Sequence, residues 1–545
     1  MSTPTLSTSP PSASDLGENA RLSSEKPPAL PFTQRHRKAI ILASVVVILL
    51  LVGAILLGVL LPRFLAKNSG SGPSSNDSST NSSSNLPSVP PSEPTNATYI
   101  LSLFNNTSYD NTARANPNVP PLTESFPYGS QPIRGVNLGG WLVLEPFITP
   151  SIFDPYNPNP YNASQGIIDE WTISAYLGTT AARSLLDNHY ATWVTEKDIR
   201  RIADVGLDHI RIPIAYWAID VQKDEPYIPH LSLFYFLRVL EWARKYGLRV
   251  NVDMHALPGS QNGWNHSGRS GIIGWLNGTL GSYNAYNRSL PIIAQVAKIV
   301  SQPRYRNVVT MFGLVNEPYM PSLVIDTVLK WEEDAYNVVR GEGFTGVVVI
   351  SDGFMGLNTW TGKMQPAQGY TDVALDTHFY QIFTRPQLAT THYQKISVDC
   401  TDARTSLMAS GNRSTGFGPT ILGEWSVAET DCTHFLNGVG LGNRFDGTFV
   451  DGGAAVCPNC TCKGLNDTTN WTPVYKQFLQ AFAQSQIDGY TNSWGWFYWN
   501  FKTESEPHWS YFDLVDLGIL PQKAYAPTWT CAQNLSSVPV NILQR

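Results

Sequence analysis

Eight short apolar runs separated by helical stretches constrain the fold of this chain more than any other feature. Helical patterns fill the intervals, for example at 231–247, 290–302 and 472–486. The runs are GVNLGGW (135–141), HIRIPIAYW (209–217), RVNVDMHA (249–256), VVTMFGLVN (308–316), GVVVISDG (346–353), VALDTHFY (373–380), PTILGEWS (419–426) and GWFYWNF (495–501). Strands alternating with helices are typical of a parallel sheet, and eight such units predict a (β/α)8 barrel, the TIM barrel.

Polar or aromatic residues stand at or just beyond the end of nearly every predicted strand. They are Trp141 with Glu145, Arg211, His255, Asn316 with Glu317, His378 with Tyr380, Glu424, and Trp499. In such barrels the active site lies at the C-terminal ends of the strands. Packing or a buried ion pair could explain any one of these residues, but their shared position predicts one active site.

Two glutamates in this set, Glu317 and Glu424, suit the cleavage of glycosidic bonds. Retaining enzymes hold two carboxyl groups about 5–5.5 Å apart, one as nucleophile and one as acid and then base. We predict Glu317 as the acid/base, with a pKa raised by its surroundings, and Glu424 as the ionised nucleophile. Arg211 and Tyr380 are expected to hold Glu424 charged.

The other residues of the set suit the recognition of a sugar. We expect Asn316 to bind the sugar 2-hydroxyl, Glu145 and His255 to bind other hydroxyls, and Trp499 to form the floor under the ring. Among further acidic residues, we expect Glu332 and Glu333 to lie on a solvated helix face. The role of Asp253 stays open, and Asp352 is a candidate for a supporting position.

The N-terminal part predicts a membrane anchor. Residues 1–38 are rich in Ser, Thr and Pro and should be disordered, and residues 39–61 are uncharged and apolar enough to cross about 30 Å of hydrocarbon. Glycosylation sequons occur only after this run, among them those at Asn76, Asn96, Asn162, Asn265, Asn277, Asn287, Asn412, Asn466, Asn470 and Asn534. A cleavable signal peptide is the alternative, but the apolar run is too long and starts too deep. We therefore predict a type II signal anchor at 39–61 with an extracytoplasmic C-terminal part.

Residues 62–126 form a predicted Ser- and Pro-rich disordered stalk, and residues 127–545 the folded domain. The net charge of −6 argues against a nucleic-acid partner. All six cysteines, Cys400, Cys432, Cys457, Cys460, Cys462 and Cys531, lie in the second half. An even number in an extracytoplasmic domain indicates disulfides, with fifteen pairings possible. A zinc site at 457–462 is the alternative, but a second cluster of metal ligands is missing from the sequence.

Seven motifs follow one another along the predicted domain: RGVNLGGWLVLEPFITPSIF (134–153), HIRIPIAYWA (209–218), DMHALPGSQNGWNHSGR (253–269), VNEP (315–318), THFYQIF (377–383), ILGEWS (421–426) and FYWNFKTE (497–504). In this order they resemble the fungal exo-β-1,3-glucanases of glycoside hydrolase family 5. The resemblance implies a (β/α)8 fold, no metal or other cofactor, and release of glucose from non-reducing ends of β-1,3-glucan with retention. The anchor and stalk resemble a membrane-bound branch of the family, which implies a catalytic domain outside the plasma membrane and facing the cell wall.

The resemblance also assigns roles by position. The acid/base falls on Glu317, the nucleophile on Glu424, and the first sugar subsite on Glu145, Arg211, His255, Asn316, His378, Tyr380 and Trp499. An aromatic pair that clamps the next sugar matches Trp264 and Phe383, with Trp264 where relatives often have Phe. The family's disulfides imply Cys400 with Cys531 and Cys432 with one of the clustered cysteines, of which Cys462 is favoured, and leave Cys457 with Cys460 as a local pair.

Two rival functions share these features. One is an enzyme of the same mechanism that transfers glucose to another sugar, or that acts on β-1,6-glucan or a glucolipid. The other is a non-catalytic glucan-binding wall protein, which would not need both carboxylates. We expect a monomer with β-glucan and the membrane as its partners.

Overall fold

A computed structural model of the chain describes residues 87, 96–105, 108–159, 161–163, 166–276 and 285–531. These residues belong to one compact unit, Leu86–Arg545. The predicted tail at 1–38, the predicted anchor at 39–61 and most of the predicted stalk at 62–126 lie outside the described residues. Within the described ranges, none of the helices combines the length and the apolar character needed to cross a bilayer.

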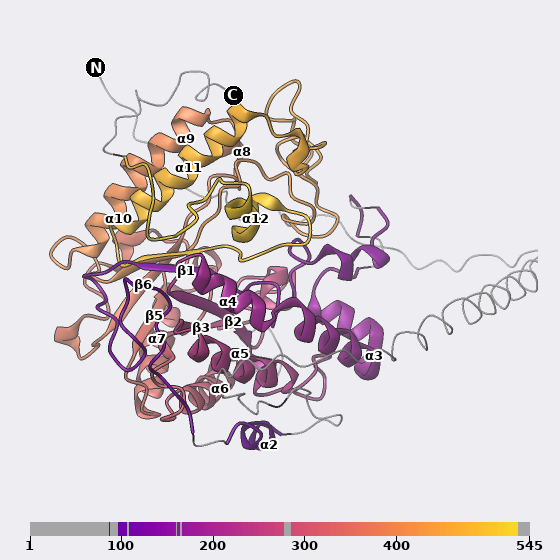
Figure 1. The fold of residues 1–545 in the computed structure, drawn as a ribbon. Coiled ribbons are helices and arrows are strands. Elements are labelled where there is room, and N and C mark those ends of the chain that lie inside the picture. Colours follow the sequence, from indigo (N-terminus) through magenta and orange to yellow (C-terminus); the bar gives the residue numbers. More distant parts are fainter. Residues whose placement is uncertain are drawn as a thin grey trace, which may run out of the picture. The chain divides into compact units, whose positions relative to one another are not determined.

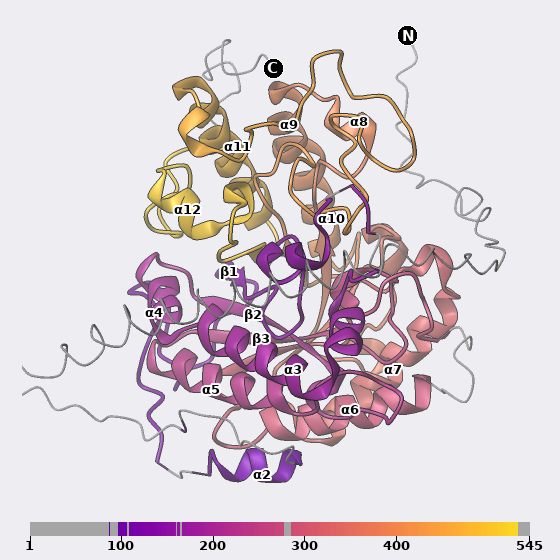
Figure 2. The same cartoon turned by 90° about the vertical axis from the view of Figure 1, so that its right-hand side faces the viewer.

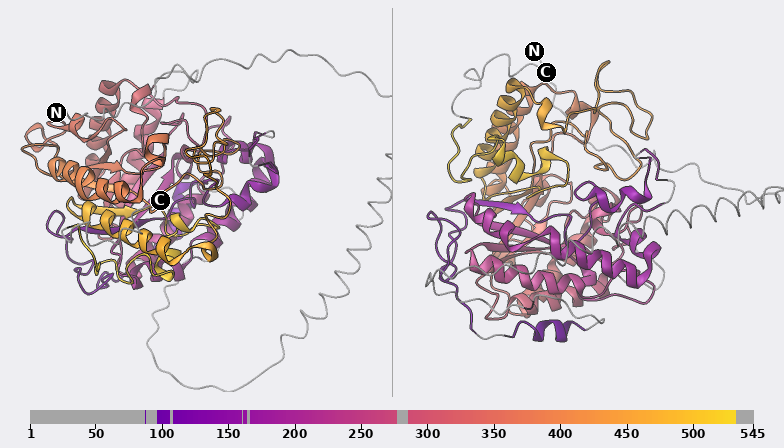
Figure 3. Two further views of the ribbon diagram at one scale, coloured as in Figure 1. Left: turned by 90° about the horizontal axis from the view of Figure 1, so that it is seen from above. Right: turned by 45° about the vertical axis from the view of Figure 1, so that its right-hand side comes forward.

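Eight parallel strands form a closed barrel in sequence order, as the sequence predicts. The strands are β1 (Ile133–Asn137), β2 (His209–Ala215), β3 (Arg249–Ala256), β4 (Val309–Gly313), β5 (Val347–Ser351), β6 (Val373–His378), β7 (Thr420–Glu424) and β8 (Gly495–Tyr498). Strand β1 pairs with β8 to close the barrel, with Gly135 opposite Phe497. The C-terminal segment (yellow) therefore lies against the first strand (indigo to purple) in Figure 3.

Helices cover the outside of the barrel. They are α2 (Ala97–Ser102), α3 (Glu170–Trp193), α4 (Glu196–Asp204), α5 (Leu231–Lys245), α6 (Ala285–Val300), α7 (Ile325–Gly341), α8 (Arg385–Leu388), α9 (His392–Val398), α10 (Arg404–Gly411), α11 (Pro473–Thr491) and α12 (Tyr511–Asp516). Figures 1 and 2 show α3 to α7 on one side of the strands and α8 to α12 on the opposite side.

The strands form where the sequence is apolar on both faces, because helices outside and side chains inside bury them completely. Every residue of β2, β3 and β7 is buried. The helices begin at polar caps: the side chain of Asp169 accepts a hydrogen bond from the backbone of Thr172 at the start of α3, and Thr195 does the same for Asp198 in α4.

Helix α7 corrects one expectation. Glu332 was expected on a solvated face, but its side chain is fully buried, whereas Glu333 is partly exposed. The buried stripe of α7 includes Val328, Trp331 and Ala335, and Glu332 falls within it at helical spacing. Burial raises the pKa of Glu332 well above its ordinary value.

The described end of the predicted stalk packs on the barrel domain. Ile100 and Phe104 are buried, and the Phe104 ring lies 5.6 Å from that of Phe234 in α5. Further along, Leu122 and Phe126 are also buried. The packed unit therefore includes residues that the Ser- and Pro-rich composition assigned to the stalk, since a few apolar anchors suffice to hold a short irregular segment.

Three disulfides join the six cysteines in the pairing that the family resemblance implies: Cys400–Cys531, Cys432–Cys462 and Cys457–Cys460. The first bridges residues 131 positions apart and ties the last described residue to the segment between α9 and α10. The second and third hold the long connection between β7 and α11, which lacks strands and α-helices.

We expect replacement of both Cys400 and Cys531 by serine to lower the free energy of unfolding by about 4–5 kcal/mol, because this bridge closes a long loop in the unfolded chain. Denaturant titration of the full chain measures the loss. The matched change of Cys457 and Cys460, which lie three residues apart, should cost less than half as much. Equal losses for the two double variants would contradict this expectation.

Candidate active site

The carboxylates of Glu317 and Glu424 face each other at the C-terminal end of the barrel. Glu424 ends β7, and Glu317 lies just beyond β4. One oxygen of each carboxylate lies within 4.8 Å of the other, and a ring nitrogen of His378 lies within the same distance of both. Both glutamates are buried. This spacing suits a retaining enzyme better than an inverting one, in which about 6.5–9.5 Å separates the two groups.

Three donors surround the carboxylate of Glu424. Arg211 Nη1 donates to Oε1 at 3.0 Å and the Tyr380 hydroxyl donates to Oε2 at 2.9 Å. His378 Nδ1 lies 3.5 Å from Oε2. Burial raises the pKa of Glu424 above its ordinary value, while the positive charges of His378 and Arg211 oppose that rise.

Glu317 shares a short contact with His378. The Nδ1 atom of His378 lies 2.6 Å from Oε1 of Glu317, and His266 Nε2 lies 3.5 Å from the other oxygen. Glu317 has a φ of +48°, a backbone conformation that side chains other than glycine rarely adopt and that is frequent at functional sites.

The electrostatics of Glu317 differ from the sequence expectation of a raised pKa. Burial would raise the pKa of Glu317, but the hydrogen bond and the charge of His378 outweigh burial and lower it to about 2. The contact with His378 therefore favours an ionised Glu317 carboxylate beside a protonated imidazole. The sequence does not predict the lowered pKa of Glu317, because it does not reveal that His378 Nδ1 lies 2.6 Å from the Glu317 carboxylate.

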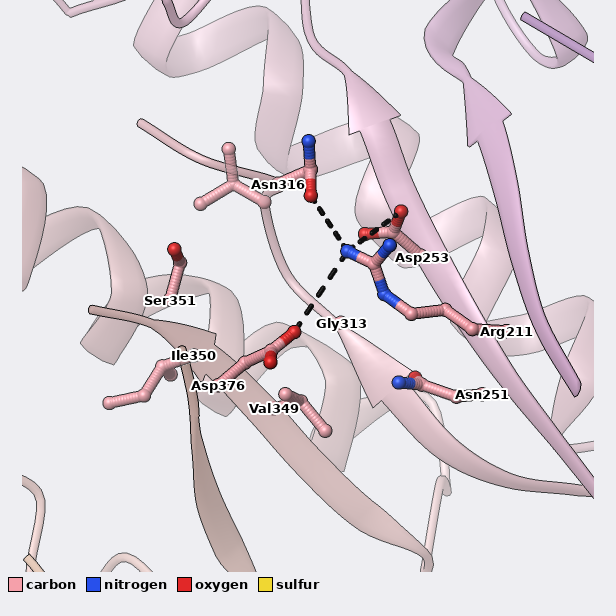
Figure 4. Close-up of a pocket in the computed structure, with 10 residues that line it drawn as sticks. Arg211, Asn251, Asp253, Gly313, Asn316, Val349, Ile350, Ser351 and Asp376 are labelled. Carbon is pink, nitrogen blue, oxygen red and sulfur yellow. Dashed lines mark hydrogen bonds and ion pairs between the residues drawn. The ribbon is translucent and has the colours of Figure 1, made fainter. Parts of the chain in front are cut away.

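The guanidinium of Arg211 organises the floor of the pocket. Its Nη1 donates to Asn137 Oδ1 at 3.0 Å and its Nη2 to Asn316 Oδ1 at 2.7 Å. Nη2 also lies 3.2 Å from Asp253 and 3.9 Å from Asp376. Figure 4 shows Asn316, Asp253 and Asp376 converging on Arg211 beside a small cavity that has room for about one water molecule.

Trp499, His255 and Glu145 lie on another side of the site. The ring of His255 stacks on Trp499 with centroids 5.6 Å apart, and its Nδ1 lies 2.7 Å from Asp253. A Cβ at Gly139 would lie 2.5 Å from the Trp499 ring, so the indole reaches this position only because residue 139 is glycine. Glu145 Oε1 accepts from the backbone N–H of Gly140, and burial together with the charge of Glu424 raises its pKa well above the ordinary value.

Two partly exposed aromatic residues mark the mouth of the site. Trp264 and Phe383 are each 39% exposed. Trp264 packs on Tyr319 and Phe354 and lies two positions before His266, while Phe383 packs edge-on against Tyr380. Trp264 therefore lies near His266, which contacts Glu317, and Phe383 packs on Tyr380, which donates to Glu424.

The structure therefore brings the sequence-predicted residues into one site. It also adds residues that sequence reasoning did not select: His266, Asn137 and Asp376. Asp253, whose role was left open, proves to contact both Arg211 and His255. The sequence contains a pattern that could have identified Asp253 and Asp376 as site residues, because Asp-x-His occurs near the end of both β3 and β6.

Glu317, His378 and Glu424 lie close enough together to hold a metal ion. Among the described residues they are the one cluster of three or more possible metal ligands. In the structure, His378 and Arg211 supply positive charge at these carboxylates.

Comparisons with known proteins agree with this geometry. Residues 178–437 match the family model of cellulase (glycosyl hydrolase family 5). Over 434 residues the chain is 49% identical to probable glucan 1,3-beta-glucosidase D of Aspergillus fumigatus, covering 78% of the chain and 51% of that relative. Identity to the protein of the same description from Aspergillus terreus is 47% over 440 residues, covering 79% and 51%. The chain thus spans about half the length of the curated relatives it matches.

Among solved structures, rutinosidase from Aspergillus niger is similar with a TM-score of 0.55 and 22% identity, covering 72% of the chain and 98% of that protein. At this level of identity the likeness concerns the fold alone.

Proposed function

We propose that this chain belongs to glycosyl hydrolase family 5, whose model matches residues 178–437, and that it is a retaining exo-β-1,3-glucanase that releases glucose from the non-reducing ends of cell-wall β-1,3-glucan. The relatives described as probable glucan 1,3-beta-glucosidases support the substrate class. The observation that carries the proposal is the pair of carboxylates, Glu317 and Glu424, whose nearest oxygens lie within 4.8 Å of each other.

In the first step of this mechanism, Glu424 attacks the anomeric carbon of the terminal glucose as Glu317 delivers a proton to the departing glycosidic oxygen. The bond from that carbon to the departing oxygen breaks, and an ester bond to Glu424 forms. The proton comes from the Glu317–His378 pair, in which a 2.6 Å contact allows its transfer to the carboxylate. A sugar in the pocket displaces water, which favours the neutral form of Glu317.

In the second step, Glu317 acts as base and removes a proton from water, which attacks the anomeric carbon and releases β-glucose. The ester to Glu424 breaks and its carboxylate is restored. An acceptor sugar in place of water would give a longer oligosaccharide instead.

The remaining residues would hold the reacting sugar. Asn316, oriented by Arg211, suits the 2-hydroxyl, and Glu145, His255 and His378 suit other hydroxyls. Trp499 would form the apolar floor. Trp264 and Phe383 would clamp the next sugar at the mouth.

We also propose that residues 39–61 anchor the chain as a single-pass type II protein of the plasma membrane, joined by a disordered stalk to a domain facing the cell wall. The three disulfides support an oxidising compartment for that domain. The position of every sequon quoted above, after the apolar run, supports the same orientation.

The full chain incubated with laminarin and, separately, with a β-1,6-glucan tests the proposed function, with products followed by NMR. We expect early release of β-glucose from laminarin and little product from the β-1,6-glucan. Oligosaccharides longer than the substrate would indicate a transglycosylase. Early release of α-glucose, or absence of turnover on laminarin, would refute the proposal.

A further inference from the structure

The ends of β3 and β6 carry the same short motif, Asp-x-His. Asp253 precedes His255 in β3, and Asp376 precedes His378 in β6. Figure 4 shows the two aspartates reaching Arg211 from two different strands of the barrel. Each aspartate also contacts the histidine of its own strand: Asp253 lies 2.7 Å from His255 Nδ1, and Asp376 lies 3.5 Å from His378 Nε2.

Both ring nitrogens of His378 therefore face carboxylates, Nδ1 toward Glu317 at 2.6 Å and Nε2 toward Asp376 at 3.5 Å. A neutral imidazole has one donor and one acceptor nitrogen, whereas the protonated ring donates from both. The geometry thus favours the imidazolium form, in which Asp376 balances the side of the ring that faces away from Glu317.

The Asp376 carboxylate fits beside β7 only because residue 423 is glycine. Its side chain is buried, and a Cβ on Gly423 would lie 2.2 Å from Asp376 Oδ1. The residue before Glu424 can therefore carry no side chain while Asp376 keeps this position. The carboxylate is wedged between β6 and β7, next to the proposed nucleophile.

We propose that Asp376 is a positioning residue that orients His378 and retains its proton, so that the Glu317–His378 pair holds the proton required by the departing glycosidic oxygen. This inference rests on the proposed function and adds to it a group that need not touch substrate. Charged and titratable groups from several elements act on this histidine, and Asp376 is the one on its own strand. The others are Glu317 beyond β4, Glu424 of β7, Asp253 of β3, Asp352 after β5 and His266 in the loop after β3.

The charge of Asp376 has a definite sign of effect. Against burial, the charges of Glu424 and Asp376 and the hydrogen bonds to Asp376 and Glu317 raise the pKa of His378 well above its ordinary value. Removing one of these negative charges lowers the proton affinity of the Glu317–His378 pair. The pair then loses its proton at a lower pH, and the alkaline limb of the pH–activity profile moves to lower pH.

The pH dependence of kcat/KM on laminarin tests this role in the full chain. For Asp376→Asn, which keeps the shape and removes the charge, we expect the alkaline limb to move to lower pH by about one unit or more. The matched variant Asp253→Asn removes a charge that lies closer to Arg211 but does not contact His378. It should lower activity while shifting the alkaline limb by much less.

If Asp376 only supports Arg211, both variants should lower activity and neither should move the alkaline limb. An unmoved limb in Asp376→Asn, or equal shifts in the two variants, would overturn the inference. Gly423→Ala provides a second variant that keeps every charge but displaces the carboxylate, and it should move the limb in the same direction as Asp376→Asn.

A readout independent of turnover separates this inference from the proposed function. In the full chain labelled with 15N-histidine, we expect the His378 ring, assigned by its loss in His378→Gln, to titrate at lower pH in Asp376→Asn than in the unmodified chain. Identical titration curves would refute the role of Asp376 even if the enzyme hydrolyses laminarin. A shifted curve in a chain that fails to hydrolyse laminarin would instead refute the proposed function alone.

Discussion

Glu424→Gln is expected to lower kcat on laminarin by about 10⁴-fold or more, because the glutamine amide cannot form the glycosyl ester. Glutamine has nearly the size of glutamate. In the unmodified chain Arg211 Nη1 donates to Glu424 Oε1 at 3.0 Å, and the amide oxygen of glutamine can accept the same hydrogen bond. Binding of the sugar should therefore survive while turnover is lost. Glucose release from laminarin and from an aryl β-glucoside measures the effect.

A matched control is Glu333→Gln, which makes the same change at a partly exposed position of α7 and should leave kcat unchanged. Mass spectrometry after reaction with a 2-fluoro-glucoside should detect a covalent adduct on Glu424 in the unmodified chain and none in Glu424→Gln. Substantial turnover in Glu424→Gln would exclude this residue as the nucleophile.

Glu317→Gln is expected to lower activity on laminarin by about 10²–10⁴-fold while sparing the first step with substrates that need no acid. A dinitrophenyl β-glucoside has such a leaving group, so its phenolate should still appear in a rapid burst. The second step should be slow because the glutamine amide cannot activate water. Stopped-flow absorbance of the released phenolate measures both phases.

Azide distinguishes the two roles. As an anion it needs no base, so it should attack the ester in Glu317→Gln, restore turnover and yield β-glucosyl azide. In Glu424→Gln the burst should be absent. Equal slowing of the aryl glucoside and laminarin in Glu317→Gln would contradict the acid/base role.

The barrel was predictable from the sequence because buried parallel strands are apolar on both faces. RVNVDMHA coincides with β3 from Arg249 to Ala256. Other bounds were less accurate: β1 begins two residues earlier than expected and ends at Asn137, because the Gly-Gly pair at 139–140 leaves the sheet. Apolar composition indicates that a strand exists, whereas its ends depend on hydrogen bonds to neighbouring strands.

The residues that gather at the C-terminal end of the barrel were also predictable, since they follow strand ends and belong to recognisable motifs. Their electrostatics were not. The lowered pKa of Glu317 depends on a 2.6 Å contact with His378, and a strand-end pattern does not specify such a distance. The prediction of a solvated Glu332 was wrong because the face of α7 that packs on the barrel includes this one glutamate among apolar residues.

The fit between Gly423 and Asp376 limits how this pocket can change during descent. A side chain at position 423 would collide with the carboxylate in its present place, so a larger residue there requires Asp376 to move or to change as well. We therefore expect the two positions to covary among related chains. We expect glycine at position 423 in any related chain that keeps the aspartate in this place, so a residue on one strand dictates the residue beside the proposed nucleophile on the next.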